Sequence, residues 1–514
     1  MRRSIRRPRR RTFVVAAVAI GLAITAAVWV VLPSGPSRHP RQVIVEQAPP
    51  IAPVPTTIGF HDPDVYFGSD ADIARAFDAM QATNVRAVRL MIPWAGVEPT
   101  RNQFDWSKID RTVDAAASRH MMILGVVNAS PAWAVAPNAP AITGRPASAT
   151  QYADFCAKLA QRYRGIISAY EIWNEPNGAA FFAPAPDAAG YTELLKAAYP
   201  RIKAADPSAT VLGGALGSVI DRGTSTINPV EFVQQMYAAG AKDYLDALSF
   251  HPYQYTLKFS DGYPIPNSPM NQVVAIRQLM LANGDASKKI WATEYGEPAT
   301  EADESGQAAF ITDLIRKWPE MPYAGPIMIH TTRDRRTGSA DPEDVFGVYR
   351  SDGSAKPAAT AMKDLIAAGT PRTAEYQRFS EIHDEGYGEV LSPVFRATPE
   401  VWAQTRTEAT LYETPSGIIA SPNPVADKAR LYGIAPKAPF QDGYQDMDSP
   451  AGVRIWWSPG TGAHSAGAGI VEGWTPRLGL AISDEQPQGS GVRVDFEHGY
   501  VTWQQGAGAT AHVT

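Results

Sequence analysis

The stretch YEIWNEPN, residues 170–177, decides the fold. The run GIISA, residues 165–169, precedes it and is apolar and β-branched, which predicts a buried strand. Pro176 cannot donate a hydrogen bond to a neighbouring strand, so we expect the strand to end there. The chain then presents Asn174 and Glu175 at the carboxyl end of a strand, the edge where α/β sheets and barrels carry their chemistry.

A second acidic residue follows a strand pattern in the same way. Residues 289–296, KIWATEYG, form another short apolar run that ends in Glu294. A lone glutamate after a strand is ordinarily a solvated loop residue, but two of them in one chain indicate paired-carboxylate cleavage of a glycoside. That reaction needs a proton donor on one face of the sugar and a carboxylate on the other.

Eight strand patterns alternate with amphipathic helix patterns between residues 57 and 370. The predicted strands are 57–61, 85–92, 121–128, 167–174, 210–216, 247–251, 289–294 and 325–330, with helices between them such as 72–83, 109–119, 188–204, 229–239, 271–282 and 306–317. This order predicts a (β/α)8 TIM barrel. A doubly wound sheet also alternates, but no glycine-rich phosphate loop opens the first helix, which favours the closed barrel.

The barrel pattern resembles clan A of the glycoside hydrolases, whose acid/base and nucleophile lie at the ends of strands four and seven. Further motifs agree: RLMIPW at 89–94, VEP at 97–99, FDW at 104–106, SFHPY at 249–253, FGV at 346–348 and KPA at 356–358. The set is most similar to family 39 and to the cellulase-like family 5. The resemblance covers roughly residues 57–370.

The resemblance implies a retaining mechanism in which Glu175 is the acid/base and Glu294 the nucleophile, about 5–5.5 Å apart. We expect repulsion between these carboxylates to raise the pKa of the acid. Glu297 lies in the loop after Gly296 and is a less suitable nucleophile, and Glu171 lies mid-strand and predicts packing or an internal ion pair. The predicted substrate-binding residues are Arg89, Trp94, Asn128, Trp133, Asn174, His251, Tyr253 and His330.

These residues have different expected roles. Arg89 would orient the nucleophile through its guanidinium, although a structural ion pair inside the barrel is an alternative. Asn174 would bind the sugar 2-hydroxyl. Trp94 and Trp133 are candidate sugar platforms, whereas tryptophan is by default a packing residue. His251 either lines the subsite with Tyr253 or is a buried, satisfied histidine.

One position departs from the clan pattern. Clan members often place a tryptophan platform at the end of strand eight, where this chain has His330 and a charged loop. Substrates such as β-glucans or xylan are therefore not implied. No cluster has metal-ligand spacing, so we expect no metal and no cofactor, and the absence of a GxSxG elbow argues against an esterase.

The amino-terminal region predicts a membrane anchor. Residues 1–12 form a basic cytoplasmic segment, and residues 13–32 are an uncharged stretch long enough to span a bilayer at about 1.5 Å per residue. A signal peptide, which would make the protein secreted and wall-associated, is the alternative. Residues 33–56 are rich in proline and predict an extended tether.

The charge distribution separates this terminus from the rest of the chain. Residues 1–41 hold nine arginines and no acidic residue, which leaves a formal charge of −14 for residues 42–514. An acidic main body argues against nucleic acid as a partner.

Residues 371–514 predict a different unit, a small all-β module. YETPSG at 412–417, WSPGTGAH at 457–464 and WQQG at 503–506 form a weak repeat with a period of about 45 residues. LGLAISDE at 478–485 resembles the LGFP repeat of cell-envelope proteins in mycolic-acid actinobacteria, although Leu480 and Ala481 replace its Phe-Pro. The resemblance implies binding to a cell-wall glycan, and a β module that only packs on the barrel is the alternative.

We therefore expect a plasma-membrane protein with a single anchor, a cytoplasmic amino terminus and an extracytoplasmic barrel. The barrel would cleave O-glycosidic bonds of a cell-envelope or extracellular polysaccharide. A non-catalytic wall-binding scaffold and a transglycosylase are the alternatives.

Overall fold

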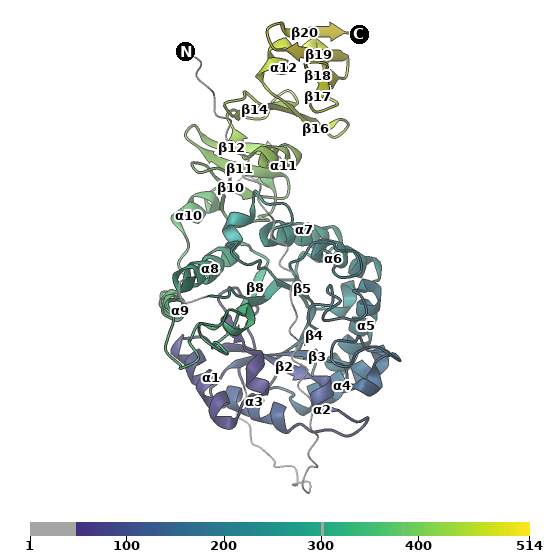
Figure 1. Ribbon diagram of the computed structural model, residues 1–514, viewed down its shortest axis with the longest axis vertical. Coiled ribbons are helices and arrows are strands. Elements are labelled where there is room, and N and C mark those ends of the chain that lie inside the picture. The colour runs from purple at the N-terminus through teal and green to yellow at the C-terminus, as the bar shows by residue number, and fades with distance from the viewer. Residues whose placement is uncertain (1–47, 300–302, 384) are drawn as a thin grey trace. The chain divides into compact units, whose positions relative to one another are not determined.

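The computed structural model describes residues 48–299, 303–383 and 385–514. Eight parallel strands form a closed barrel in the order of the sequence (Figure 1). They are β1 (Ile58–His61), β2 (Ala87–Pro93), β3 (Met122–Asn128), β4 (Ala169–Ile172), β5 (Thr210–Gly217), β6 (Ala247–His251), β7 (Ile290–Tyr295) and β8 (Ala324–His330). The predicted TIM barrel is confirmed.

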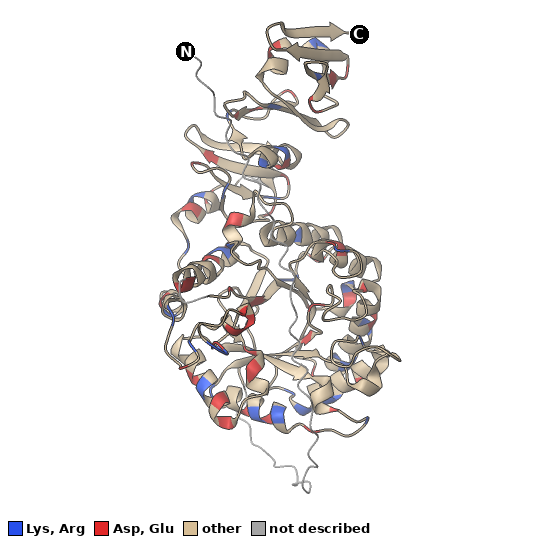
Figure 2. Ribbon diagram, viewed as in Figure 1, with Lys and Arg blue, Asp and Glu red and all other residues tan. Residues whose placement is uncertain are grey.

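A helix follows each strand and covers the outside of the barrel (Figure 1). In chain order these helices are α1 (Asp70–Ala82), α3 (Ser107–Ala117), α4 (Ala149–Arg162), α5 (Ala188–Ala205), α6 (Pro229–Ala238), α7 (Pro269–Ala282), α8 (Glu304–Lys317) and α9 (Pro357–Ala367), and the short α2 (Trp94–Val97) precedes α3. Charged residues lie mainly on these helices and the loops, and much less on the strands (Figure 2). This distribution follows from burial, because a parallel sheet is covered on both faces.

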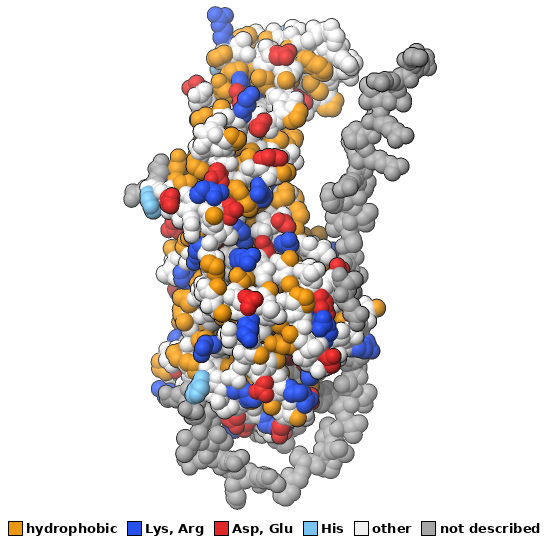
Figure 3. Space-filling model, turned by 90° about the vertical axis from the view of Figure 1, so that its left-hand side faces the viewer, with side chains coloured by type: hydrophobic (Ala, Val, Ile, Leu, Met, Phe, Trp, Pro, Cys, Tyr) orange, Lys and Arg blue, Asp and Glu red, His pale blue; other side chains and the backbone are white. Residues whose placement is uncertain are grey.

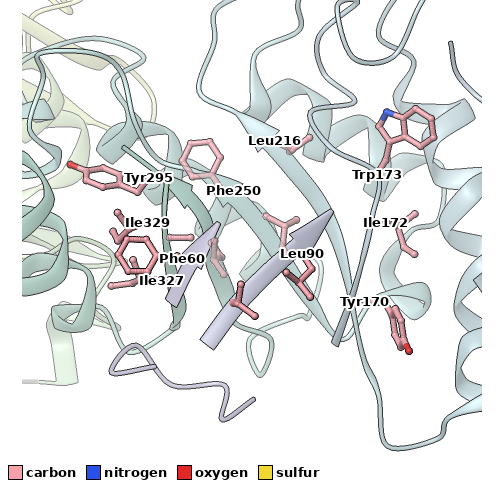
Figure 4. Packing of buried hydrophobic residues seen from close by; sticks show 14 of the residues in the cluster. Phe60, Leu90, Tyr170, Ile172, Trp173, Leu216, Phe250, Tyr295, Ile327 and Ile329 are labelled. Atoms are coloured by element: carbon pink, nitrogen blue, oxygen red, sulfur yellow. The ribbon is translucent and has the colours of Figure 1, made fainter. Parts of the chain in front are cut away.

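The outward faces of the strands form the larger hydrophobic core. Phe60, Leu90, Ile172, Phe250 and Ile329 belong to this core and are at most 1% exposed (Figure 4). Since side chains alternate along a strand, their neighbours in sequence face the barrel interior.

The barrel interior is packed with small residues around one large ring. Ala87, Ala169 and Ala247 surround Trp291, and Ile51, from the segment predicted as a tether, joins the same cluster. Arg89 and Glu171 come two positions after Ala87 and Ala169, so they occupy the next interior layer towards the carboxyl ends of the strands. The apolar layer thus forms the floor of a polar pocket.

The carboxyl-terminal region contains three four-stranded antiparallel sheets, each preceded by a helix. The first unit is α10 (Ala374–Ser380) with β9 (Phe395–Arg396), β10 (Trp402–Thr405), β11 (Ala409–Thr414) and β12 (Gly417–Pro422). The second is α11 (Asn423–Tyr432) with β13 (Ala435–Pro436), β14 (Tyr444–Asp448), β15 (Arg454–Ser458) and β16 (Gly462–Ala466). The third is α12 (Ala468–Gly473) with β17 (Gln486–Gln488), β18 (Gly491–Phe496), β19 (Gly499–Gln504) and β20 (Gly508–Val513).

The predicted repeat corresponds to these units. Pairs Thr414–Gly417, Ser458–Gly462 and Gln504–Gly508 close the last hairpin of each sheet. The prediction of an all-β module is wrong in one respect, because α10, α11 and α12 alternate with the sheets. Each helix is short, and α11 starts at an Asn-Pro pair that is also typical of a turn.

The first sheet shares its core with the barrel, whereas the third shares a core with the second. The rings of Phe395 and Tyr263 stack with centroids 4.0 Å apart, and the Lys317 ammonium donates to the Val394 carbonyl at 2.8 Å. In the third unit, Ile470 and Phe496 pack instead against Trp456 of the second.

No helix in the described ranges is long and apolar enough to span a bilayer. The predicted cytoplasmic segment, residues 1–12, and the predicted anchor, residues 13–32, lie outside those ranges.

Candidate functional site

The turn after β4 places Glu175 over the barrel interior. β4 ends at Ile172, earlier than predicted, because Trp173 and Glu175 adopt left-handed backbone with φ of 69° and 47°. The strand therefore stops before Pro176, and the expectation that this proline ends it is wrong. The Asn177 side chain holds the turn by donating to the carbonyls of Gly217 and Ile227 at 2.9 and 3.0 Å.

Glu294 reaches the same pocket through an irregularity in β7. Trp291 faces the barrel interior, so a residue three positions later would face outwards on a regular strand. The register between β7 and β8 shifts between Ala292 and Tyr295, which breaks the alternation and lets Glu294 face inwards.

Arg89 is the centre of the polar layer below the pocket. Its guanidinium is fully buried and donates to Glu171 at 2.6 Å, to Glu294 at 2.7 Å and to the Asn174 side-chain oxygen at 2.6 Å. Arg89 therefore orients the predicted nucleophile and also forms an internal ion pair with Glu171, so both readings of its role describe part of the structure.

Glu294 is surrounded by donors and is only 8% exposed. Besides Arg89, its oxygens lie 3.1 Å from His61 Nε2, 3.3 Å from the Tyr253 hydroxyl and 3.6 Å from His251 Nδ1. Burial opposes the charged form, but His251, His61 and Arg89 together hold the pKa of this carboxyl well below its usual range. Glu294 is therefore ionised at neutral pH.

His251 lies between the two catalytic candidates. Its Nδ1 is 2.9 Å from an oxygen of the half-buried Glu175 and 3.6 Å from one of Glu294. Burial alone would lower the pKa of His251, but the charge of Glu294 and the hydrogen bond to Glu175 raise it. The ring is thus a donor that both carboxylates can share. The structure places the predicted residues His251 and Tyr253 beside Glu175 and Glu294.

Aromatic rings form one wall of the pocket beside Glu294. Neighbouring rings in the series Tyr253, Tyr255, Phe346, His330 and His61 have centroids 6.3, 5.6, 4.9 and 5.6 Å apart. Burial lowers the pKa of His330 to about 4, and burial followed by the charge of Arg89 lowers that of His61. Both imidazoles are neutral at pH 7, so this wall is uncharged. His330 occupies the end of β8, where clan members often have a tryptophan.

The two predicted asparagines lie at the ends of β3 and β4. Arg89 holds the oxygen of Asn174, which leaves the amide nitrogen to face a ligand. The buried Oδ1 of Asn128 has no partner among the described residues, and the same is true of His251 Nε2 and His330 Nδ1.

The two predicted sugar platforms differ. Trp94 is 0% exposed, and the rings of Trp133, Tyr152 and Phe155 pack around it. The expected platform at Trp94 is therefore wrong, because its ring has no free face. Trp133 is half-buried, and its indole N–H donates to the Glu98 carbonyl at 3.0 Å, so part of the ring remains accessible.

Sequence reasoning missed His61, Tyr255 and Phe346. His61 is the last residue of a predicted strand, and that position was a usable signal because strand ends form the site. Phe346 begins the FGV motif, which carries part of the family resemblance but assigns the ring no role. Tyr255 lies in the loop after β6, where the sequence offers no comparable signal.

The fold also brings possible metal ligands together. One ligand atom each from Glu175, His251 and Glu294 lies within 4.8 Å of the other two. His251 Nδ1 and one oxygen of Glu175 lie 2.9 Å apart, so a cation bound through these two atoms would have to compete with their hydrogen bond.

Comparisons with known proteins give the family. The family profile Cellulase (glycosyl hydrolase family 5) matches residues 51–318. A family 39 glycoside hydrolase from the gut symbiont Bacteroides cellulosilyticus WH2 has a similar fold, with a TM-score of 0.52 and 19% identity over 82% of this chain and 81% of that chain. A monomeric beta-xylosidase from Caulobacter crescentus CB15 gives a TM-score of 0.49 and 18% identity over 71% of this chain and 74% of that chain.

At these identities the structural similarity describes the fold alone. No curated protein matches the sequence. Because the profile match spans more than half of the 514 residues, the chain belongs to glycosyl hydrolase family 5, the cellulase family, within clan A.

Proposed function

We propose that the protein is a retaining glycoside hydrolase in which Glu294 is the nucleophile and Glu175 the acid/base. Family membership supports glycosidase activity. The observation that carries the mechanism is the approach of the two carboxylates, with an oxygen of Glu175 and one of Glu294 within 4.8 Å. Retaining enzymes separate these groups by about 5–5.5 Å, and inverting enzymes by about 6.5–9.5 Å to admit a water.

In the first step Glu294 attacks the anomeric carbon while Glu175 protonates the leaving oxygen. Glu294 is suited to attack because it is ionised and held by Arg89 and His61. Loss of the proton leaves Glu175 charged, and the His251 N–H at 2.9 Å stabilises that charge. In the second step Glu175 takes a proton from a water molecule whose oxygen attacks the anomeric carbon. The bond from that carbon to Glu294 breaks, and the sugar leaves with its original configuration.

Asn174 supports the transition state. Its oxygen is fixed by Arg89, so its amide nitrogen is directed to the 2-hydroxyl of the sugar. A hydrogen bond at this hydroxyl strengthens as the oxocarbenium-like state forms. Asn128, Tyr253 and His330 bind further hydroxyls of the same sugar.

We propose a cell-envelope or extracellular polysaccharide as the substrate and the plasma membrane as the location. The uncharged stretch 13–32 and the preceding arginines support an anchor with the barrel on the extracytoplasmic side. The carboxyl-terminal region supports a second contact, with cell-wall glycan, because residues 478–485 of its third unit resemble the LGFP repeat.

Turnover of a panel of 4-nitrophenyl glycosides and envelope polysaccharides by the full-length protein tests the mechanism. Glu294→Ala and Glu175→Gln should each lower kcat/KM by about three orders of magnitude or more. Glu297→Gln is the matched control, because it neutralises a nearby carboxylate that accepts from the Thr256 N–H and can be replaced by an amide oxygen. NMR of the first product should show retained configuration.

Inverted product, or normal turnover by the Glu294 or Glu175 variant, would refute the assignment. Products larger than the substrate would identify a transglycosylase, and binding of wall glycan without any cleavage would identify a scaffold.

A further inference from the structure

A groove of about 690 Å³ runs along the outside of the barrel beside α4. Gln151, Asp154, Lys158 and Gln161 of that helix line it, and their spacing of three and four residues places them on one face. The loop after α2, Trp133 and the end of α5 complete the lining, which includes neither Glu175 nor Glu294.

The groove is basic although the main body of the chain is acidic. Its lining contains Arg101, Lys158, Arg164 and Arg201 but only two acidic residues. Both acids already have partners. Asp154 pairs with Arg201. Glu98 is buried and accepts from the Trp94 indole at 2.8 Å and from the Asn102 N–H at 2.7 Å.

Three exposed cations of the lining remain, Arg101, Lys158 and Arg164, and the Lys158 ammonium lies 5.4 Å from the centre of the Phe104 ring. Within the described ranges, none of them has a carboxylate oxygen within 4 Å. The face of the molecule in Figure 3 is different, since acidic and basic side chains are interspersed there. The groove is thus a local site of positive charge.

Trp133 connects this charge to the barrel opening. It lies in the short helix Ala132–Ala134, after the end of β3, and therefore near the edge of the barrel that carries the catalytic residues. The guanidinium of Arg101 lies 5.9 Å from the centre of its ring. A half-buried indole beside a cation suits a sugar ring that bears a negative group, because the ring covers the C–H face and the cation binds the anion.

We propose that this groove binds an acidic polysaccharide, whose anionic groups contact Arg101, Lys158 and Arg164 and whose chain continues past Trp133 towards the catalytic pocket. The inference rests on the proposed function, since it assigns a substrate class to the same enzyme. Nucleic acid is also a polyanion, but single strands are usually held by several stacking aromatic side chains, and the groove contains one half-buried ring.

Affinity electrophoresis of the full-length protein in mild detergent tests the proposal, with polygalacturonate as the acidic probe and pullulan as the neutral one. Polygalacturonate should retard the wild-type protein and pullulan should not. The triple variant Arg101→Gln, Lys158→Gln, Arg164→Gln should raise the Kd for polygalacturonate by about tenfold or more. Binding by the wild type should weaken as salt rises from about 0.05 to about 0.5 M, because the cations are exposed.

The matched control carries Arg222→Gln, Lys363→Gln and Lys437→Gln, which remove the same charge from exposed positions elsewhere. It should change the Kd less than about twofold, because the electrostatic effect of distant exposed charges is screened. Thermal unfolding of both triple variants shows whether they are folded.

Equal binding by the groove variant and the wild type would overturn the inference, as would equal losses in the two triple variants. Tighter binding of a single-stranded DNA 20-mer than of polygalacturonate would also overturn it, in favour of nucleic acid. Binding is measured without turnover, so the two proposals fail separately. Cleavage of glycosides without binding of polygalacturonate would refute only the proposed role of the groove. Binding of polygalacturonate without cleavage of any glycoside would refute only the proposed hydrolase activity.

Discussion

Replacement of Arg89 by methionine tests the polar layer that supports the site. The substitution removes three hydrogen bonds of 2.6–2.7 Å, of which the two to carboxylates are buried and the one to Asn174 is partly buried. Bonds of this kind contribute about 1.5–3 kcal/mol each but are not additive when they share one guanidinium. Loss of one partner of a buried ion pair costs about 3–5 kcal/mol, so we expect the free energy of unfolding of the barrel to fall by about 4 kcal/mol at pH 7.

The loss should depend on pH in a defined direction. Burial opposes ionisation of Glu294, but His251, His61 and Arg89 outweigh it and depress its pKa, so this group stabilises the wild type above the unfolded pKa, about 4.3. That stability disappears as pH falls through the folded pKa. In the variant, burial without the guanidinium disfavours the charged carboxylates, and protonation relieves this cost. The difference between wild type and Arg89→Met should therefore shrink below about pH 5.

Urea-dependent hydrogen exchange of peptides from β2 and β4 measures this loss in the barrel itself. Arg350→Met is the control, because the Arg350–Glu304 pair is partly exposed and should contribute no more than about 1 kcal/mol. The double variant Arg89→Met, Glu171→Leu should recover part of the loss, since it removes one stranded carboxylate. If Arg89→Met unfolds at the same urea concentration as the wild type, or loses no more free energy of unfolding than Arg350→Met, then the bonds of Arg89 do not stabilise the barrel as we expect.

Three further substitutions have defined outcomes. Burial, followed by the charge of Asp64, raises the pKa of Asp62 to about 6, so this acid destabilises the fold as pH rises from about 4 to 7. Asp62→Asn should raise the free energy of unfolding by about 1–3 kcal/mol at pH 7 and leave it unchanged at pH 4 in urea titrations. Trp94→Ala should lower the free energy of unfolding by about 3–5 kcal/mol and leave KM unchanged. A raised KM would show that Trp94 contacts the sugar after all. His61→Phe removes the donor to Glu294 and should lower kcat about 10–100-fold in steady-state assays, and wild-type kcat would show that His61 does not position the nucleophile.

The barrel and the approach of Glu175 to Glu294 could be predicted from the sequence because the signals are local. Each strand is a short apolar run, and Glu175 and Glu294 each lie at the end of one. The carboxyl ends of parallel strands meet at one edge, so two such positions converge even when more than a hundred residues separate them.

The remaining features depend on tertiary contacts. The turn at Glu175 needs the bonds from Asn177 to Gly217 at the end of β5 and to Ile227 in the loop after it, which a strand pattern does not show. The burial of Trp94 depends on Tyr152 and Phe155 of α4, and a tryptophan carries no mark that separates core from platform. The short helices α10–α12 were missed because their length, glycines and prolines are also typical of turns.

The core that the last two sheets share has a consequence for how the protein melts. Ile470 and Phe496 pack with Trp456 of the preceding unit and are separate from the hydrophobic cluster that holds the barrel closed, so the terminal repeat need not lose its structure when the barrel does. Calorimetry should then record more than one endotherm, and a single melting temperature would misrepresent the enzyme. Heating can unfold the barrel and abolish catalysis while the terminal repeat stays folded. The terminal repeat can equally unfold first.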